Sequence, residues 1–295
     1  MPDPPCPPRM TVGVVCSLGI GPEKGGRKHN EDNYLVCCDG EIRWREGDGE
    51  AVHPASGHSV LLAVADGMGG HEDGAWASAS AVQAMAGLYT THPDMSPELA
   101  LHRFFLATHR RLHNSLAHDG CVRSGTTLAC AWIVGSRLAW IHVGDSRIYL
   151  FRGDVLERLT REHTRRLFAQ RDRRRIPTDP DQLAQNFIFG SRGLGDNAGI
   201  RIDPGLDSGA FPLRPEDRIL ACSDGLWGFV GDEDIAEVLK TVPAPADCAR
   251  MLVDRALECG SDDNVTALVA RVERLGRKDP SGPMRLRAAD TFAPW

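Results

Sequence analysis

Five acidic sites that lie beside glycine or asparagine at the ends of expected strands could do chemistry together. The five sites are Glu31-Asp32, Asp66-Gly67, Gly144-Asp145-Ser146, Asp224-Gly225 and Asp262-Asp263-Asn264. They border short apolar runs that we expect to form buried strands. If these strands belong to one sandwich, their carboxylates can converge at one edge. Like charges gathered there raise one another's pKa and resist ionisation, so a bound divalent cation would resolve the conflict.

The ligand chemistry of such a cluster favours hard cations. Oxygen ligands without cysteine or histidine are typical of Mg²⁺ or Mn²⁺ rather than zinc. Two such ions bridged by one carboxylate form the arrangement that generates a nucleophilic hydroxide from water at neutral pH. Asp66 ends the apolar run 60–65, and Gly67 lets a main-chain carbonyl reach the second metal, so Asp66-Gly67 is the natural bridge. On its own, an Asp-Gly pair after a strand equally fits an ordinary turn.

The elements expected to position these residues alternate between strands and helix pairs. Strands are expected at 11–18, 33–38, 60–65, 126–134, 137–143, 147–151, 155–159 and 265–272, with another ending at Asp224. Helices are expected at 74–90, 97–116, 232–241 and 245–259. We interpret 39–57 as an irregular hairpin and the strands between 126 and 159 as one antiparallel meander. This order predicts an α+β fold with mainly antiparallel sheets covered by helix pairs.

Composition excludes several classes of protein. The chain has 295 residues, 42% hydrophobic and 25% charged, as in soluble globular proteins. A net charge of −6 argues against a nucleic-acid binder. Nine cysteines without a C-x-x-C pair give no support for a zinc ribbon and suggest a reducing, cytoplasmic setting. No apolar run approaches the ~18 residues of a membrane span.

We expect a flexible tail at 1–10, a domain at 11–272 and a second tail at 273–295.

One basic run stands out in this acidic chain. It consists of Arg165, Arg166, Arg171, Arg173, Arg174 and Arg175. Such a run fits a solvated surface, and it equally fits a local site for acidic or phosphorylated partners.

Six short motifs, in this order, resemble the metal-dependent (type 2C) serine/threonine protein phosphatases. They are Arg27-x-x-Asn30-Glu31-Asp32, Asp66-Gly67-Met68-Gly69-Gly70-His71, Ser124-Gly125-Thr126-Thr127, Gly144-Asp145-Ser146-Arg147, Ser223-Asp224-Gly225-Leu226 and Asp263-Asn264-Val265-Thr266. Each motif alone is weak, but six in the family's order over residues 11–272 are specific. The second motif resembles the bacterial branch. The resemblance implies a four-layer αββα sandwich, in which two packed antiparallel sheets are flanked by pairs of helices.

The resemblance also implies a dinuclear Mn²⁺ or Mg²⁺ centre that hydrolyses phosphoserine and phosphothreonine in one step through a metal-bridging hydroxide. Asp66 would bridge the ions, with the Gly67 carbonyl and Glu31 on one of them. Asp224 and Asp263 would complete the site of the other ion.

The remaining motif residues would have supporting roles. Arg27 would bind the substrate phosphate, and Asp145 would help to hold a third metal. Asp32 would be a supporting acid behind the ligands, and Asn264 would orient the Asp263 loop.

The sequence departs from the family pattern at the proton donor and at the flap. Animal members have histidine directly after Asp-Gly, whereas this chain has Met68. His71 is a candidate general acid, but a metal-bound water is the favoured proton donor, and His71 also fits a structural histidine at the start of the helix. The family's mobile flap corresponds here to the arginine-rich segment, which either selects acidic phosphopeptides or is simply solvated.

The expected partners are phosphorylated proteins and a cognate bacterial serine/threonine kinase, with the protein itself a monomer that binds neither nucleic acid nor membrane. An inactive, scaffold-like phosphatase fold is the alternative, although every expected metal ligand is present. A metal-dependent nuclease or nucleotide hydrolase is disfavoured by the acidic charge balance.

Overall fold

The computed structural model describes residues 9–38, 41–46, 49–56, 59–68, 72–90, 96–117, 125–164, 167, 170 and 207–275. His71, the arginine-rich segment and most of both expected tails lie outside these residues. Strand β1 (Arg9–Ser17) begins within the expected N-terminal tail, and Met10 is buried there. Strand β13 (Val265–Arg274) ends the described fold.

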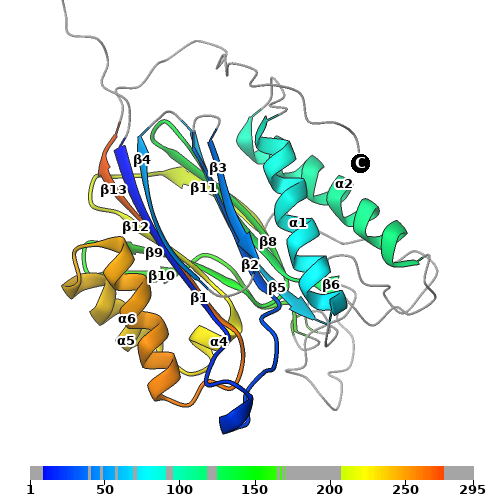
Figure 1. Ribbon diagram of the computed structural model, residues 1–295. Helices are drawn as coiled ribbons and strands as arrows, with labels where there is room; N and C mark the ends of the chain where they lie inside the picture. Colours follow the sequence, from blue (N-terminus) through cyan, green and yellow to red (C-terminus); the bar gives the residue numbers. More distant parts are fainter. Residues whose placement is uncertain are drawn as a thin grey trace, which may run out of the picture.

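Two antiparallel sheets form the centre of the molecule (Figure 1). The first has the order β10-β9-β12-β13-β1-β4. Its further strands are β4 (Gly49–Ser56), β9 (Arg147–Arg152), β10 (Val155–Arg158) and β12 (Arg218–Cys222). The second has the order β11-β8-β7-β5-β2-β3, and β6 pairs with the end of β5. Its strands are β2 (Asp32–Cys38), β3 (Glu41–Glu46), β5 (Ser59–Met68), β6 (Gly125–Thr126), β7 (Leu128–Val134), β8 (Arg137–Val143) and β11 (Ser208–Pro212).

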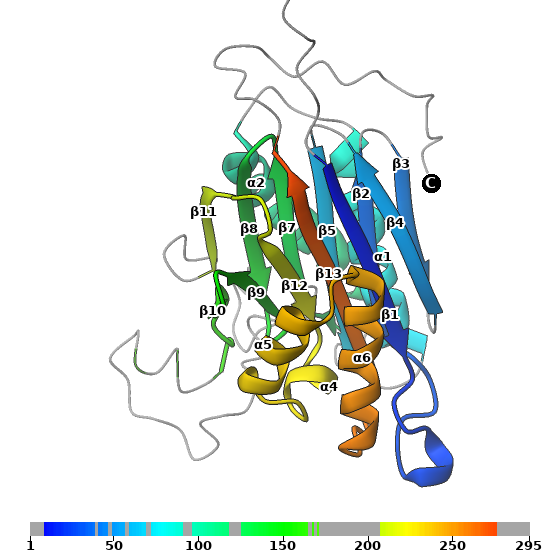
Figure 2. The same cartoon turned by 90° about the vertical axis from the view of Figure 1, so that its left-hand side faces the viewer.

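Helices cover the outer face of each sheet, as Figures 1 and 2 show from two directions. Helices α1 (Glu72–Thr90) and α2 (Pro97–Ala117) pack on the second sheet. Helices α5 (Asp232–Thr241) and α6 (Pro245–Glu258), with the short α4 (Asp224–Trp227), cover the first. This confirms the predicted four-layer αββα sandwich.

Three apolar layers hold these four structural layers together. Consecutive residues of β2 show the arrangement: Leu35 belongs to the cluster under α1 and α2, whereas Val36 belongs to the cluster between the sheets. Leu252 of α6 lies in the third cluster, beneath the first sheet's helices. Because β5 is covered on both faces, it reads in the sequence as a continuous apolar run rather than an alternating one.

Two sequence interpretations were wrong about strand pairing. The segment 39–57 is not a hairpin, because β3 pairs with β2 in one sheet and β4 pairs with β1 in the other. The strands between 126 and 159 are not one meander. Strands β7 and β8 pair in the second sheet, while β9 pairs with β10 and β12 in the first. Strand β11 was not predicted. Pairing depends on tertiary contacts between distant segments, which local patterns do not specify.

Within the described part of the chain, no helix combines the length and the hydropathy needed to cross a membrane.

Candidate metal centre

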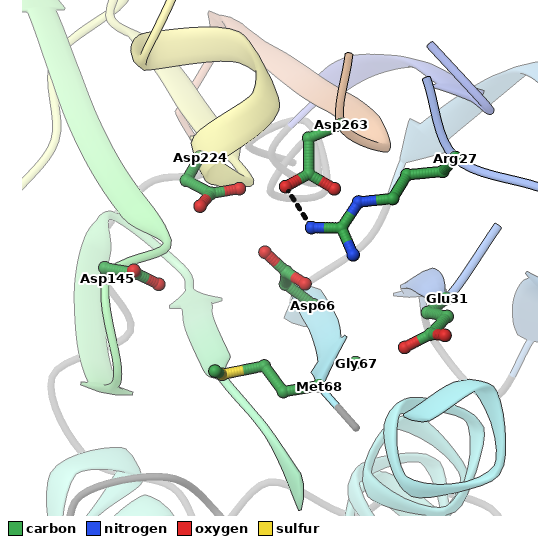
Figure 3. A pocket seen from close by; sticks show the side chains of 8 residues that line it. All are labelled: Arg27, Glu31, Asp66, Gly67, Met68, Asp145, Asp224 and Asp263. Atoms are coloured by element: carbon green, nitrogen blue, oxygen red, sulfur yellow. Dashed lines mark hydrogen bonds and ion pairs between the residues drawn. The ribbon is translucent and has the colours of Figure 1, made fainter. Parts of the chain in front are cut away.

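One pocket gathers residues from five separate segments of the chain (Figure 3). It is lined by Arg27, Glu31, Asp66, Gly67, Met68, Asp145, Asp224 and Asp263. Arg27 and Glu31 come from the connection between β1 and β2, and residues 66–68 form the end of β5. Asp145 lies between β8 and β9, Asp224 begins α4, and Asp263 precedes β13. Both sheets therefore contribute strand ends to the same pocket.

Hydrogen bonds to the threonines of the Ser-Gly-Thr-Thr motif fix the backbone of Asp66. Its N–H donates to Thr127 Oγ1 at 3.0 Å, and its carbonyl accepts from the Thr127 N–H at 2.8 Å. Thr126 Oγ1 donates to the same carbonyl at 2.9 Å. None of these bonds uses the Asp66 carboxylate, which stays available to the pocket.

Three carboxylates meet at the centre of the pocket. Asp66, Asp145 and Asp224 each offer an oxygen, and these oxygens lie within 4.8 Å of one another. Loss of hydration, followed by the nearby acids Asp32, Asp224 and Asp145, raises the pKa of Asp66 well above its usual range. Burial and then Asp224 raise the pKa of Asp145 to about 7. The protein thus holds three acids where their negative charges are unfavourable.

The donor set fits a hard divalent cation. Burial, and then Asp263, raises the pKa of Asp224. Among the described residues, the buried Oδ1 of Asp224 has no hydrogen-bond partner. A buried carboxylate oxygen without a partner is costly, and a cation would satisfy it. All ligand atoms offered here are oxygens, which is the chemistry that Mg²⁺ and Mn²⁺ prefer.

Arg27 and Asp263 form an ion pair at one side of the pocket. Arg27 Nη2 lies 2.7 Å from Asp263 Oδ2, and Figure 3 shows the guanidinium reaching over Asp66. The Asp263 bond is also the main reason that the pKa of Arg27 is raised. Asp263 Oδ1 accepts the N–H of Asn264 at 2.8 Å. Asp263 therefore lines the pocket as the partner of a cationic side chain, that of Arg27.

Glu31 lies against helix α1, where close packing requires glycine. A Cβ at Gly74 would collide with Glu31 Oε2, and a Cβ at Gly67 would collide with the carbonyl oxygens of Gly74 and Glu31. The Gly67 N–H donates to the Glu31 carbonyl at 3.2 Å. Gly74 was missed by the sequence analysis, because it belongs to none of the quoted motifs.

Asp32 lies behind the pocket and does not line it. Its side chain is completely buried, and Oδ2 accepts from Ser223 Oγ and Thr266 Oγ1, both at 2.6 Å. Burial raises the pKa of Asp32 to about 7. Asp32 and Asp66 face each other in the register of β2 and β5, so the two acids are neighbours across the ladder.

Asn264 ties the loop before β13 to the loop before β2. Its Oδ1 accepts the Glu31 N–H at 2.9 Å, and its Nδ2 donates to the carbonyls of Leu18 and His29. These contacts tie the backbone of Glu31 to the residue that follows Asp263.

Comparison with known proteins assigns the chain to a family. The family model for protein phosphatase 2C matches residues 38–265, which is more than half of the chain. The chain therefore belongs to the protein phosphatase 2C family.

Two bacterial relatives are similar over most of this chain. It is 36% identical over 216 residues to serine/threonine protein phosphatase PstP of Mycobacterium tuberculosis, a match that covers 72% of this chain and 40% of PstP. It is 28% identical over 243 residues to serine/threonine phosphatase stp of Listeria innocua, covering 80% of this chain and 92% of that protein. The chain thus spans less than half the length of PstP.

The fold is also that of solved phosphatase structures. The crystal structure of the PstP catalytic domain in complex with two manganese ions superimposes with a TM-score of 0.66 at 29% identity. That match covers 90% of this chain and 99% of the other. A structure of PppA, described as a regulatory component of T6SS in Pseudomonas aeruginosa, matches with a TM-score of 0.65 at 26% identity.

Proposed function

We propose that this protein is a serine/threonine protein phosphatase that hydrolyses phosphoserine and phosphothreonine with the help of Mn²⁺ or Mg²⁺. The observation that carries the proposal is the pocket itself. It places the three central carboxylates within 4.8 Å of one another, in a chain that belongs to the protein phosphatase 2C family. The two manganese ions in the related PstP domain support the same chemistry.

The pocket residues divide into proposed ligands for two ions. Asp66 would contact both, with the Gly67 carbonyl and Glu31 on one side. Asp224 and Asp263 would serve the other ion, which requires Arg27 to leave Asp263 Oδ2. Asp145 would serve a third ion or support the Asp66–Asp224 side, where its oxygen already lies.

Bound ions would supply a hydroxide nucleophile from water and would offset the charge of the phosphoryl oxygens. Arg27 is the cationic side chain that lines the pocket, and its planar guanidinium suits two phosphate oxygens at once. Released from Asp263, Arg27 would orient the phosphate group towards Asp66. Met68 has no transferable proton, so we propose that water, rather than this side chain, protonates the leaving alkoxide.

The proposed substrates are phosphorylated proteins, including targets of a bacterial serine/threonine kinase. The names of PstP and stp support this class, because both are called serine/threonine phosphatases.

The enzyme hypothesis and the scaffold hypothesis predict different results in one assay, the hydrolysis of p-nitrophenyl phosphate. Purified protein should hydrolyse p-nitrophenyl phosphate when Mn²⁺ is added. Hydrolysis should stop when the metal is chelated, because the proposed nucleophile is a water molecule that bound ions would activate. Initial rates of p-nitrophenolate release with Mn²⁺, with Mg²⁺ and with chelator measure this. Absence of metal-dependent turnover in a folded sample would favour a scaffold instead.

A further inference from the structure

A buried histidine–aspartate pair lies directly beneath the loop that carries Asp145. His163 Nε2 and Asp207 Oδ1 are 2.6 Å apart, although the two residues are 44 positions apart in the chain. Both side chains are almost completely buried. Neither residue lines the pocket, and no motif drew attention to either of them.

His163 forms two hydrogen bonds with Gly144, the residue before Asp145. The backbone N–H of His163 donates to the Gly144 carbonyl at 2.9 Å. The backbone N–H of Gly144 donates to the ring nitrogen Nδ1 of His163 at 3.2 Å. Because Nδ1 accepts a proton donor, the hydrogen of the neutral ring must be on Nε2. Asp207 accepts that hydrogen and thereby fixes both the tautomer and the orientation of the ring.

Asp207 is itself held in place by strand β8. Its carbonyl accepts the N–H of His142 at 2.9 Å, and the His142 and His163 rings lie 4.6 Å apart. His142 Nε2 lies 2.9 Å from the carbonyl of Arg161. Burial lowers the pKa of His142 to about 3, so this second ring stays neutral beside the pair.

The Gly144–Asp145 loop has little other freedom. Gly144 has φ +105°, and a Cβ there would come within 2.6 Å of the Thr127 methyl group. Trp227 Nε1 donates to the Asp145 carbonyl at 3.1 Å. His163, through Gly144, and Trp227, through the Asp145 carbonyl, therefore restrict the direction in which the Asp145 carboxylate enters the pocket.

We propose that His163, oriented by Asp207, is a positioning residue that aims the Asp145 carboxylate and so sets the pocket's affinity for a divalent cation. The inference rests on the proposed function, because it assumes that Asp145 helps to bind a cation. If His163 only filled the core, its replacement would lower folding stability. It would not lower cation affinity beyond the effect of an equally destabilising substitution elsewhere.

Two substitutions of His163 separate its two ring contacts. Asparagine can place an amide oxygen near the position of Nδ1 and so keep an acceptor for Gly144. Glutamine can place an amide nitrogen near Nε2 and keep a donor for Asp207, but it loses the acceptor for Gly144. We expect His163→Gln to weaken the Asp145-dependent Mn²⁺ binding about 10- to 100-fold, the usual range for residues that orient metal ligands. His163→Asn should retain more of this affinity.

The experiment measures Mn²⁺ binding by electron paramagnetic resonance of the free ion, together with thermal melting of each variant. The binding that Asp145→Asn removes defines the Asp145-dependent part. In the Asp145→Asn background, His163→Gln should cause no further loss, because it acts through Asp145. Val253→Ala, in the helix layer of α6, is the control that lowers the melting temperature without weakening Mn²⁺ binding.

Wild-type affinity in His163→Gln would overturn the inference, and so would a further loss in the Asp145→Asn background. If His163→Gln does not melt cooperatively, Asp207→Asn and Asp207→Ala test the same contacts. Asp207→Asn keeps an oxygen for the Nε2–H of His163, so this variant should bind Mn²⁺ more tightly than Asp207→Ala. Equal affinities of the two variants would contradict the proposal. Wild-type protein that binds Mn²⁺ without hydrolysing p-nitrophenyl phosphate would refute the proposed function alone.

Discussion

Replacing Asp66 by asparagine should reduce metal-dependent phosphatase activity by more than about 100-fold, because residues that merely orient metal ligands already contribute 10- to 100-fold. The variant should still fold. The Asp66 backbone is held by Thr126 and Thr127 through bonds that do not involve the carboxylate. Rates of p-nitrophenyl phosphate hydrolysis and Mn²⁺ binding isotherms measure the two losses.

Thermal melting tests the same variant in a second way, because the stability of the metal-free protein should not fall with its activity. Asp66 lies among Asp32, Asp145 and Asp224, whose charges raise its pKa, so removing one charge relieves repulsion in the metal-free protein. Without metal, Asp66→Asn should therefore melt at the same temperature as the wild type or higher. With Mn²⁺, only the wild type should gain stability, because binding to the folded state stabilises it.

A matched control separates this effect from loss of charge in general. Asp254 is an exposed acid on helix α6, away from the pocket, so Asp254→Asn should leave activity and Mn²⁺ stabilisation unchanged. Normal Mn²⁺-dependent turnover in Asp66→Asn would contradict the assignment of Asp66 as the bridging ligand.

The contact between β5 and α1 predicts opposite behaviour for two glycines. In Gly67→Ala the new Cβ meets backbone carbonyls of Gly74 and Glu31, which cannot move without displacing α1 from the sheet. We expect a loss of about 1–3 kcal/mol in the free energy of unfolding, the usual cost of overpacking. Urea unfolding of the metal-free proteins measures it.

In Gly74→Ala the new Cβ mainly meets the Glu31 carboxylate, which can rotate away, while the Gly67 backbone carbon lies at 3.3 Å. Stability should change little, while Mn²⁺ affinity and activity should fall because Glu31 leaves its place in the pocket. Gly87 lies in the same helix with open space around its Cβ position, so Gly87→Ala is the matched control. It should raise stability by about 0.5–1 kcal/mol and leave Mn²⁺ affinity unchanged. Wild-type Mn²⁺ affinity in Gly74→Ala would exclude Glu31 as a ligand on this side.

Local patterns in the sequence were sufficient to predict the main elements and the carboxylates of the pocket. The run before Asp66 is apolar at every position because β5 is buried on both faces, and the glycine that follows marks the close approach of α1. Asp224 was found by the same signal at the end of a second buried strand. In both cases the chemistry and the local pattern coincide within a few residues.

The pairing of strands could not be predicted in the same way. Strands β3 and β4 are adjacent in the sequence, yet they join different sheets. Their short lengths and polar composition fit a hairpin equally well, and only the partners β2 and β1 decide between the alternatives.

The supporting residues were missed for a related reason. Gly74 is one glycine in a helical stretch, and its role follows only from the position of Glu31. His163 and Asp207 are separated by 44 positions, so no spacing rule connects them. Contacts of this kind arise from the fold and leave no local signature.

The central claim is that the pocket around Asp66 is a metal-dependent centre for phosphoserine and phosphothreonine hydrolysis. Phosphate release from phosphoserine and phosphothreonine peptides by the purified protein tests it most directly. Release should rise with added Mn²⁺, should cease on chelation and should return when Mn²⁺ is restored. Release that continues undiminished in chelator, or no release at any Mn²⁺ concentration from protein that melts cooperatively, would contradict the claim.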